Sequence, residues 1–236
     1  MGDGRSDDGQ DAAAQGSAGH RARLRQRLIE GGGDALLDHE LVEYLLALAI
    51  PRRDTKPLAK ALLAEFGGIA GLFSADAASL ARIGGVGEGA VAAIKIVQAA
   101  SLRLLRTRAA ERPVLSNWQA LLDYLHGDMA HRITEAVRVL HLNSRNMLIR
   151  DELASEGSVD QAAVYTREVI RRAIDLGSAA IILVHNHPSG DPQPSKQDIR
   201  LTREIIEAGR PLGIAVHDHV IVGARGHSSM RALGLI

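Results

Sequence analysis

Residues 179–198 read AAIILVHNHPSGDPQPSKQD. The first six residues are apolar without alternation, which is typical of a strand buried on both faces of a sheet. Proline and glycine punctuate the middle of the segment and predict a loop that reverses the chain. From Ser195 the apolar spacing becomes helical and continues to Gly209. The segment therefore predicts a buried strand, a polar loop and a helix in succession.

Two histidines stand where this strand ends. Alternate residues of a strand point to the same side, so the imidazoles of His185 and His187 can face one point. The loop and the following helix bring Asp198 back towards them. Two imidazoles and one carboxylate supply three metal ligands and leave a fourth position for water, which is the layout of a catalytic zinc site. The chain has no cysteine, so thiolate zinc sites and disulfides are excluded.

A second interpretation of the same residues needs no metal. Ser195 and Asp198 have the spacing of a capping box, in which the hydroxyl caps the helix and the carboxylate reaches back. The loop prolines would then be turn residues, and the histidines would be ordinary core or surface residues. Burying two imidazoles without partners is costly, which favours the metal site.

The chain of 236 residues is long enough for two modest domains. Residues 1–19 carry four Asp, one Arg and no large aliphatic side chain, which predicts a disordered acidic tail. Residues 20–110 read as a helical domain, and residues 111–236 mix helical and strand patterns. The expected helices are 38–50, 57–66, 74–81, 90–106, 116–125, 165–176 and 195–209. The expected strands are 136–142, 147–154, 179–184, 214–216 and 220–222.

A family resemblance rests on several motifs. His185, His187, Ser195 and Asp198 match the pattern His-x-His-x7-Ser-x2-Asp, which resembles the metal-binding signature of the JAB1/MPN/Mov34 (JAMM) metalloenzymes. Four segments resemble the bacterial RadC family, also called UPF0758: HNHPSG at 185–190, DHVIVG at 218–223, IPRRD at 50–54 and KPLA at 56–59. The resemblance extends from His20 to Ile236. Asn186 stands where the deubiquitinating JAMM branch usually has Ser or Thr, which weakens a transfer of isopeptidase specificity.

The resemblance implies an α+β protein. Its helical N-terminal domain would carry a helix-hairpin-helix. Its C-terminal domain would have the JAMM/cytidine-deaminase-like fold, with a mostly antiparallel sheet flanked by helices. The implied cofactor is Zn²⁺, and the implied reaction is hydrolysis of a peptide or isopeptide bond in a peptide or protein substrate. Ser195 would donate its hydroxyl to the developing oxyanion.

JAMM enzymes also use an upstream glutamate as general base, and three residues compete for this role: Glu135, Glu152 and Glu168. We favour Glu135 because a carboxylate at the start of the first predicted strand can point into the site. The alternative is that Glu135 is a surface residue that follows the helical segment 116–130.

Gly85, Gly87 and Gly89 lie between two expected helices. They do not form a dinucleotide loop, because no strand precedes them and Ala90 occupies the place of the third glycine. The setting resembles a helix-hairpin-helix, whose turn can bind a DNA phosphate through backbone N–H groups. The alternative is a helix–helix turn without a ligand. The family's historic DNA-repair label implies a second function class, a DNA-associated module with a structural or nuclease metal site.

Charge and hydropathy limit the partners. Basic and acidic residues both number 28, so a uniformly basic nucleic-acid coat is excluded and only local, non-specific DNA contact remains. No apolar run approaches 18 residues, and the first 19 residues have no hydrophobic stretch. We expect a cytoplasmic protein that does not contact membranes. An inactive scaffold is the third function class, and the full ligand set argues against it.

Overall fold

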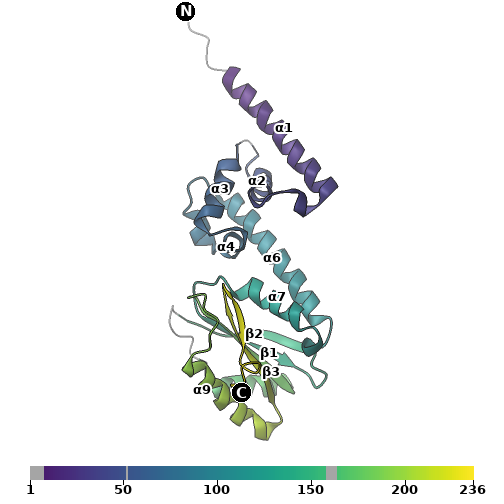
Figure 1. The fold of residues 1–236 in the computed structure, drawn as a ribbon, viewed down its shortest axis with the longest axis vertical. Coiled ribbons are helices and arrows are strands. Elements are labelled where there is room, and N and C mark those ends of the chain that lie inside the picture. The colour runs from purple at the N-terminus through teal and green to yellow at the C-terminus, as the bar shows by residue number, and fades with distance from the viewer. Residues whose placement is uncertain (1–7, 52, 158–163) are drawn as a thin grey trace, which may run out of the picture. The chain divides into compact units, whose positions relative to one another are not determined.

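The computed structural model describes residues 8–51, 53–157 and 164–236 (Figure 1). The chain divides into two compact units, Met1–Ala99 and Ala100–Ile236. The division falls inside one long helix, whereas the sequence analysis divided the chain at the end of this helix, between residues 110 and 111. The last turns of this helix belong to the second unit and pack into its core through Leu105 and Ala109.

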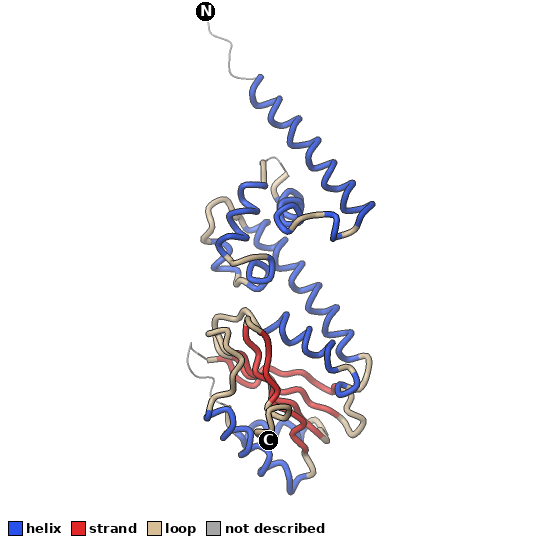
Figure 2. The backbone as a smooth tube through the Cα atoms, in the orientation of Figure 1, coloured by secondary structure: helices blue, strands red, loops and turns tan. Residues whose placement is uncertain are grey.

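The described part of the first unit is helical (Figure 2). Its elements are α1 (Asp8–Gly31), the 3-10 helix η1 (Gly33–Ala35), α2 (Asp38–Ala49), α3 (Lys56–Glu65), α4 (Ile69–Ser74), α5 (Ala77–Ala81) and the first half of α6 (Glu88–Ala110). One core joins α2, α3 and α6, and includes Leu46, Leu62 and Ile94, all fully buried. Pro57 lies in the first turn of α3, where its missing N–H costs no helical hydrogen bond.

Helix α1 begins within the segment predicted to be a tail. Residues 1–7 lie outside the described residues, and α1 begins at Asp8. Further along α1, Leu24 is buried and Arg27 pairs with Glu40 of α2 at 2.8 Å. The C-terminal turns of α1 are thereby tied to the helical core.

The second unit contains a five-stranded sheet with the order β2-β1-β3-β4-β5. Its elements are η2 (Val114–Ser116), α7 (Trp118–Met129), β1 (Ala136–Leu142), β2 (Leu148–Glu156), α8 (Thr166–Asp175), β3 (Ala180–Asn186), α9 (Lys196–Gly209), η3 (Arg210–Leu212), β4 (Ala215–Gly223) and β5 (Gly226–Ser229). Only β3 and β4 pair in parallel; the other three pairs are antiparallel. The predicted α+β fold with a mostly antiparallel sheet flanked by helices is therefore confirmed.

Helices cover both faces of this sheet. Helix α7 packs on one face, against alternate residues such as Leu140 and Ile182 (Figure 1). Helices α8 and α9 pack on the other face, against the intervening residues Val139, Ile181 and Leu183. Strand β3 lies in the centre and is buried at every position, as its unbroken apolar sequence predicts. Odd-numbered and even-numbered residues of β1 and β3 therefore point to opposite faces of the sheet.

Three local predictions need correction. The expected helix over 74–81 is split between α4 and α5, because Asp76 caps a new helix by accepting from the backbone N–H of Ser79 at 2.8 Å. The two short strands expected at 214–216 and 220–222 form the single strand β4. The polar residues between them remain in the strand because Asp218 accepts hydrogen bonds from Ser229 and Arg231. Strand β5 was not predicted.

Within the described residues, no helix has the length and apolar character needed to cross a bilayer.

Candidate metal centre

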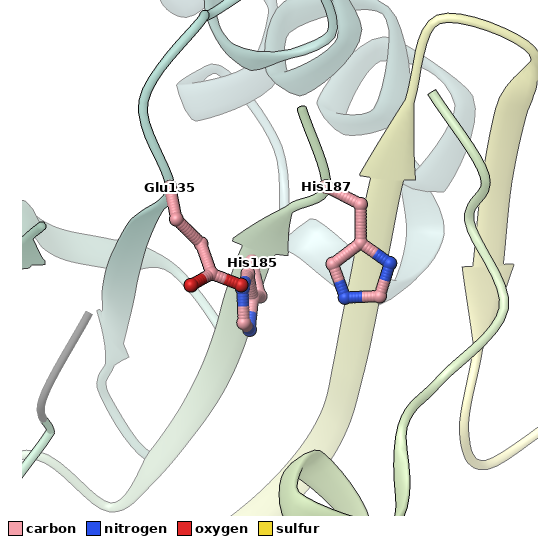
Figure 3. A group of neighbouring side chains, drawn as sticks. All are labelled: Glu135, His185 and His187. Atoms are coloured by element: carbon pink, nitrogen blue, oxygen red, sulfur yellow. The ribbon is translucent and has the colours of Figure 1, made fainter. Parts of the chain in front are cut away.

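The predicted site residues meet where β1 begins and β3 ends. Val137 of β1 pairs with His185 of β3, and Glu135 precedes Val137 by two residues. Glu135 therefore emerges on the same face of the sheet as His185. The Oε1 atom of Glu135 lies 2.6 Å from Nε2 of His185. Figure 3 shows this carboxylate directed at the imidazole, with His187 close by.

Three side chains here have the spacing of metal ligands. One ligand atom each from Glu135, His185 and His187 can be chosen so that all three lie within 4.8 Å of one another. Asp198, in the first turn of α9, contacts both imidazoles: Oδ1 lies 3.2 Å from Nδ1 of His185, and Oδ2 lies 3.5 Å from Nε2 of His187. The structure thus brings together both histidines and both carboxylates that the sequence singled out.

The capping box is present as well. Ser195 Oγ accepts from the backbone N–H of Asp198 at 3.1 Å, and Asp198 Oδ2 accepts from the backbone N–H of Ser195 at 2.8 Å. The two interpretations of the sequence are therefore compatible, because the cap fixes the carboxylate while Oδ1 still faces His185. The cap also places the Ser195 hydroxyl against Asp198, which contacts both histidines.

The electrostatics of the site favour an ionised Asp198. Burial alone would raise the pKa of its carboxyl, but hydrogen bonds from His185, His187 and Ser195 outweigh this effect and hold the pKa below its usual range. The pKa of His187 is raised, chiefly by its hydrogen bond with Asp198. A charged carboxylate between two imidazoles is a donor set that suits a divalent cation.

The tautomer of His187 follows from its backbone partner. Its Nδ1 lies 2.8 Å from the carbonyl oxygen of Asp191. A carbonyl only accepts, so Nδ1 carries a proton, and Nε2, which faces Asp198, is the nitrogen that has a lone pair for a metal when the imidazole is neutral. Orientation of a ligand imidazole by a carbonyl is the usual outer-shell arrangement of metal sites.

The loop that carries His187 rests against the end of β4. The backbone N–H of His187 donates to Val222 at 2.9 Å, and that of Arg225 donates to Gly190 at 3.3 Å. A Cβ atom on Gly223 would lie 2.5 Å from the carbonyl oxygen of Gly190, so only glycine permits this approach. Gly190 itself has φ of +78°, which favours glycine there too.

Asn186 is the functional candidate that the sequence analysis did not assign. Its Oδ1 accepts from the backbone N–H of Ala136 at 2.8 Å, and its Nδ2 donates to the carbonyl oxygen of Thr134 at 3.1 Å. The amide thus holds the chain on both sides of Glu135. One signal was available: a buried Asn at the end of an apolar strand needs hydrogen-bond partners.

His219 is linked to Asp198 through the hydroxyl of Thr202. Thr202 Oγ1 donates to the carbonyl oxygen of Asp198 at 2.6 Å and lies 2.7 Å from Nδ1 of His219. A hydroxyl has one proton, so Nδ1 of His219 is the donor in the second bond. His219 is fully buried, and burial lowers its pKa to about 3. His219 is therefore a neutral hydrogen-bonding residue and not a candidate ligand.

Glu152 and Glu168, the other two candidates for the general base, lie away from the histidine pair. Glu152 of β2 is held by the guanidinium of Arg172, at 2.5 and 2.8 Å. Glu168 of α8 pairs with Arg171 at 3.1 Å on an exposed surface. Of the three candidates for the general base, only Glu135 lies against a histidine of the site.

The predicted glycine turn belongs to the first unit. Gly85 lies between α5 and α6, with φ of +89°, while Gly87 and Gly89 flank the first residue of α6. The Arg53 guanidinium lies against this turn, with Nη1 3.5 Å from the carbonyl oxygen of Gly85. These glycines therefore lie at a turn between two helices.

Comparison with known proteins gives the same division of the chain. Residues 115–235 match the family described as RadC-like JAB domain, and residues 18–92 match the UPF0758 N-terminal family. A UPF0758 protein of Rhodobacter capsulatus is 51% identical over 213 residues, which span 90% of this chain and 100% of that relative. A UPF0758 protein of Ruegeria pomeroyi is 48% identical over 217 residues, 92% of this chain and 97% of that relative.

The sheet, its covering helices and the cluster of two histidines and a glutamate define the fold of the JAMM-type metal-dependent hydrolases. Within that class, the chain belongs to the UPF0758 (RadC) family.

Proposed function

We propose that the chain is a zinc-dependent hydrolase, specifically a metallopeptidase that cleaves a peptide or isopeptide bond in a peptide or protein. One observation carries the proposal: Glu135, a carboxylate able to move a proton, lies 2.6 Å from a histidine of the candidate metal site. A structural zinc site needs no such group, because all four of its positions are filled by ligands.

Each residue has a distinct role in this proposal. His185, His187 and Asp198 would hold the ion. Bound zinc supplies Lewis-acid activation of water, whose pKa falls to about 7 in catalytic zinc sites. Glu135 accepts the proton of the attacking water at its carboxylate and returns it to the leaving amine.

Ser195 has a further part in the proposal. Its oxygen accepts the N–H of Asp198 as a helix cap, and a hydroxyl that accepts in this way still has its own proton to donate. That proton would stabilise the oxygen on which negative charge develops during attack. The role of Ser195 is supported by its hydrogen bonds with Asp198, which itself contacts both histidines.

The proposal is tested by cleavage of defined probes. Zinc-loaded protein is incubated with a peptide library and with isopeptide-linked lysine peptides, and products are identified by mass spectrometry. We expect cleavage that disappears with a chelator, returns with zinc and is absent in Glu135→Gln. Identical product profiles for the wild type and Glu135→Gln would contradict the proposal. The two probe sets distinguish peptide from isopeptide specificity.

DNA association through the first unit is the second candidate. It is favoured by the Arg53 guanidinium, which brings positive charge to the glycine turn at the N-terminus of the 23-residue helix α6. Two arginines of helix α1 are engaged within the protein: Arg27 pairs with Glu40, and Arg21 bonds the carbonyls of Pro51 and Arg53. Arg53→Ala should therefore weaken salt-sensitive duplex binding, while Glu135→Gln should leave it unchanged. No binding at low salt would contradict this candidate.

A further inference from the structure

We propose that Asn186 is a positioning residue that sets the carboxylate of Glu135 against His185. The inference deepens the proposed function and, for its catalytic meaning, rests on it. It starts from the end of the β1–β3 ladder, whose last pair is Val137 and His185. One residue further on, the Asn186 side chain takes over the hydrogen bonding that the backbone ladder would otherwise supply.

The two bonds of Asn186 flank Glu135. The amide oxygen binds the N–H of the following residue, Ala136, and the amide nitrogen binds the carbonyl of the preceding residue, Thr134. The carbonyl of Glu135 itself accepts from Gly157 at 3.0 Å, on the side of β2. The backbone of Glu135 is therefore held from both neighbouring directions.

An amide is the group that this geometry requires. It presents one donor and one acceptor on a planar group, as a peptide does, and its two partners are a carbonyl and an N–H. Aspartate lacks the donor, and serine has a single short hydroxyl. Asn186 is 1% exposed, so a bond lost here is not replaced by bulk water. This accounts for asparagine between the two histidines.

Asn186 and His185 act from opposite faces of the sheet. His185 faces the side of the sheet covered by α8 and α9, and Asn186 points to the opposite side. Asn186 touches no predicted metal ligand through its amide. A change at Asn186 should therefore disturb the Glu135–His185 contact and leave the capacity for zinc intact.

The test uses the full chain with ¹⁵N-labelled histidine, freed of metal, and observes the imidazole proton by NMR. A carboxylate only accepts, so Nε2 of His185 donates to Glu135 and should give a downfield proton resonance correlated with the Nε2 nitrogen, distinct from any proton on Nδ1 beside Asp198, that His185→Gln removes. We expect Asn186→Ala and Asn186→Ser to lose this resonance as Glu135→Ala does. The isosteric Asn186→Asp should lose it as well, and covers the case in which the smaller side chains prevent folding.

Ser178→Ala is the matched control, because it removes another buried hydrogen bond of the same unit, 3.0 Å from Nδ1 of His141. It should retain the His185 resonance. Zinc titration of Asn186→Ala should give a Kd within about threefold of the wild type. A His185 resonance that persists in folded Asn186→Ala and Asn186→Asp would overturn the inference. Absence of zinc binding in the wild type would instead overturn the proposed function, because the NMR result does not depend on metal.

Discussion

Glu135 and His185 are joined by a contact of 2.6 Å between Oε1 and Nε2, although 50 residues separate them in the chain. The contact arises because β1 and β3 pair antiparallel, which places the start of one strand beside the end of the other. The group proposed to move a proton is thus fixed to a group proposed to bind the metal. The nitrogen must lose its proton when it binds a metal, so zinc uptake and the state of Glu135 are coupled.

Replacing Glu135 should separate catalysis from metal binding. Glu135→Gln keeps the shape of the side chain and removes its capacity to accept a proton. We expect hydrolysis to fall by about 10²–10⁴-fold, the range for loss of a general base, while zinc content stays at the wild-type level. Product formation and metal content measured on the same sample check this. Glu152→Gln is the matched control and should retain activity, because Glu152 is bound to Arg172.

Ser195 caps a helix and is also proposed to donate a hydrogen bond, and two substitutions distinguish these roles. Glycine retains most of an N-cap's stability, whereas alanine costs about 0.5–2 kcal/mol. Ser195→Gly should therefore unfold near the wild-type temperature and still lose about 10²–10³-fold in kcat, the range for an oxyanion donor. Thermal melts and turnover of both variants provide the comparison. Full activity in Ser195→Gly would show that Ser195 acts only as a helix cap.

Gly223 should matter for zinc although it is not a ligand. A Cβ atom there would meet the carbonyl oxygen of Gly190 at 2.5 Å and displace the loop that carries His187. We expect Gly223→Ala to weaken zinc binding at least tenfold, measured by competition with a chelator. Gly127→Ala is the control, because its nearest neighbours are Leu105 at 3.4 Å and Leu102 at 3.5 Å. Equal zinc affinity in both variants would show that the loop accommodates the methyl group.

The buried His219 predicts a pH dependence of stability. Its folded-state pKa is about 3, below the unfolded value of about 6.5. The unfolded chain therefore takes up a proton first as pH falls, and stability decreases between about pH 6.5 and 3 by about 1.4 kcal/mol per pH unit from this group. His219→Asn keeps a donor for Thr202 and does not titrate. Denaturant unfolding of both metal-free proteins should show that the free energy of unfolding of the wild type falls relative to that of His219→Asn as the pH decreases over this range. A constant difference would contradict the assignment.

Local sequence was enough for the elements that depend on local pattern. The apolar run before His185 predicted the central strand, and the spacing of Ser195 and Asp198 predicted a capped helix. The strands predicted at 136–142 and 147–154 form the antiparallel pair β1 and β2, in whose turn Asn143 accepts from Arg145 and Met147.

The features that were missed depend on partners far away in the chain. Asn186 bonds residues about 50 positions earlier, and no local pattern shows that a side chain will complete a sheet ladder. The approach of Gly223 to Gly190 needs the β3–β4 pairing before it can be seen. Strand β4 continues through Asp218 because two later residues satisfy its carboxylate. None of the residues that form these features is a candidate metal ligand.

The most direct test of the central claim is the zinc content of protein purified without chelators or metal-affinity resin. Elemental mass spectrometry should find close to one zinc per wild-type chain. Almost none should be found in His187→Ala and Asp198→Ala, and Ser178→Ala should match the wild type. A wild-type chain that contains no zinc and takes up none on titration would contradict the account, as would His187→Ala and Asp198→Ala variants that keep a full equivalent.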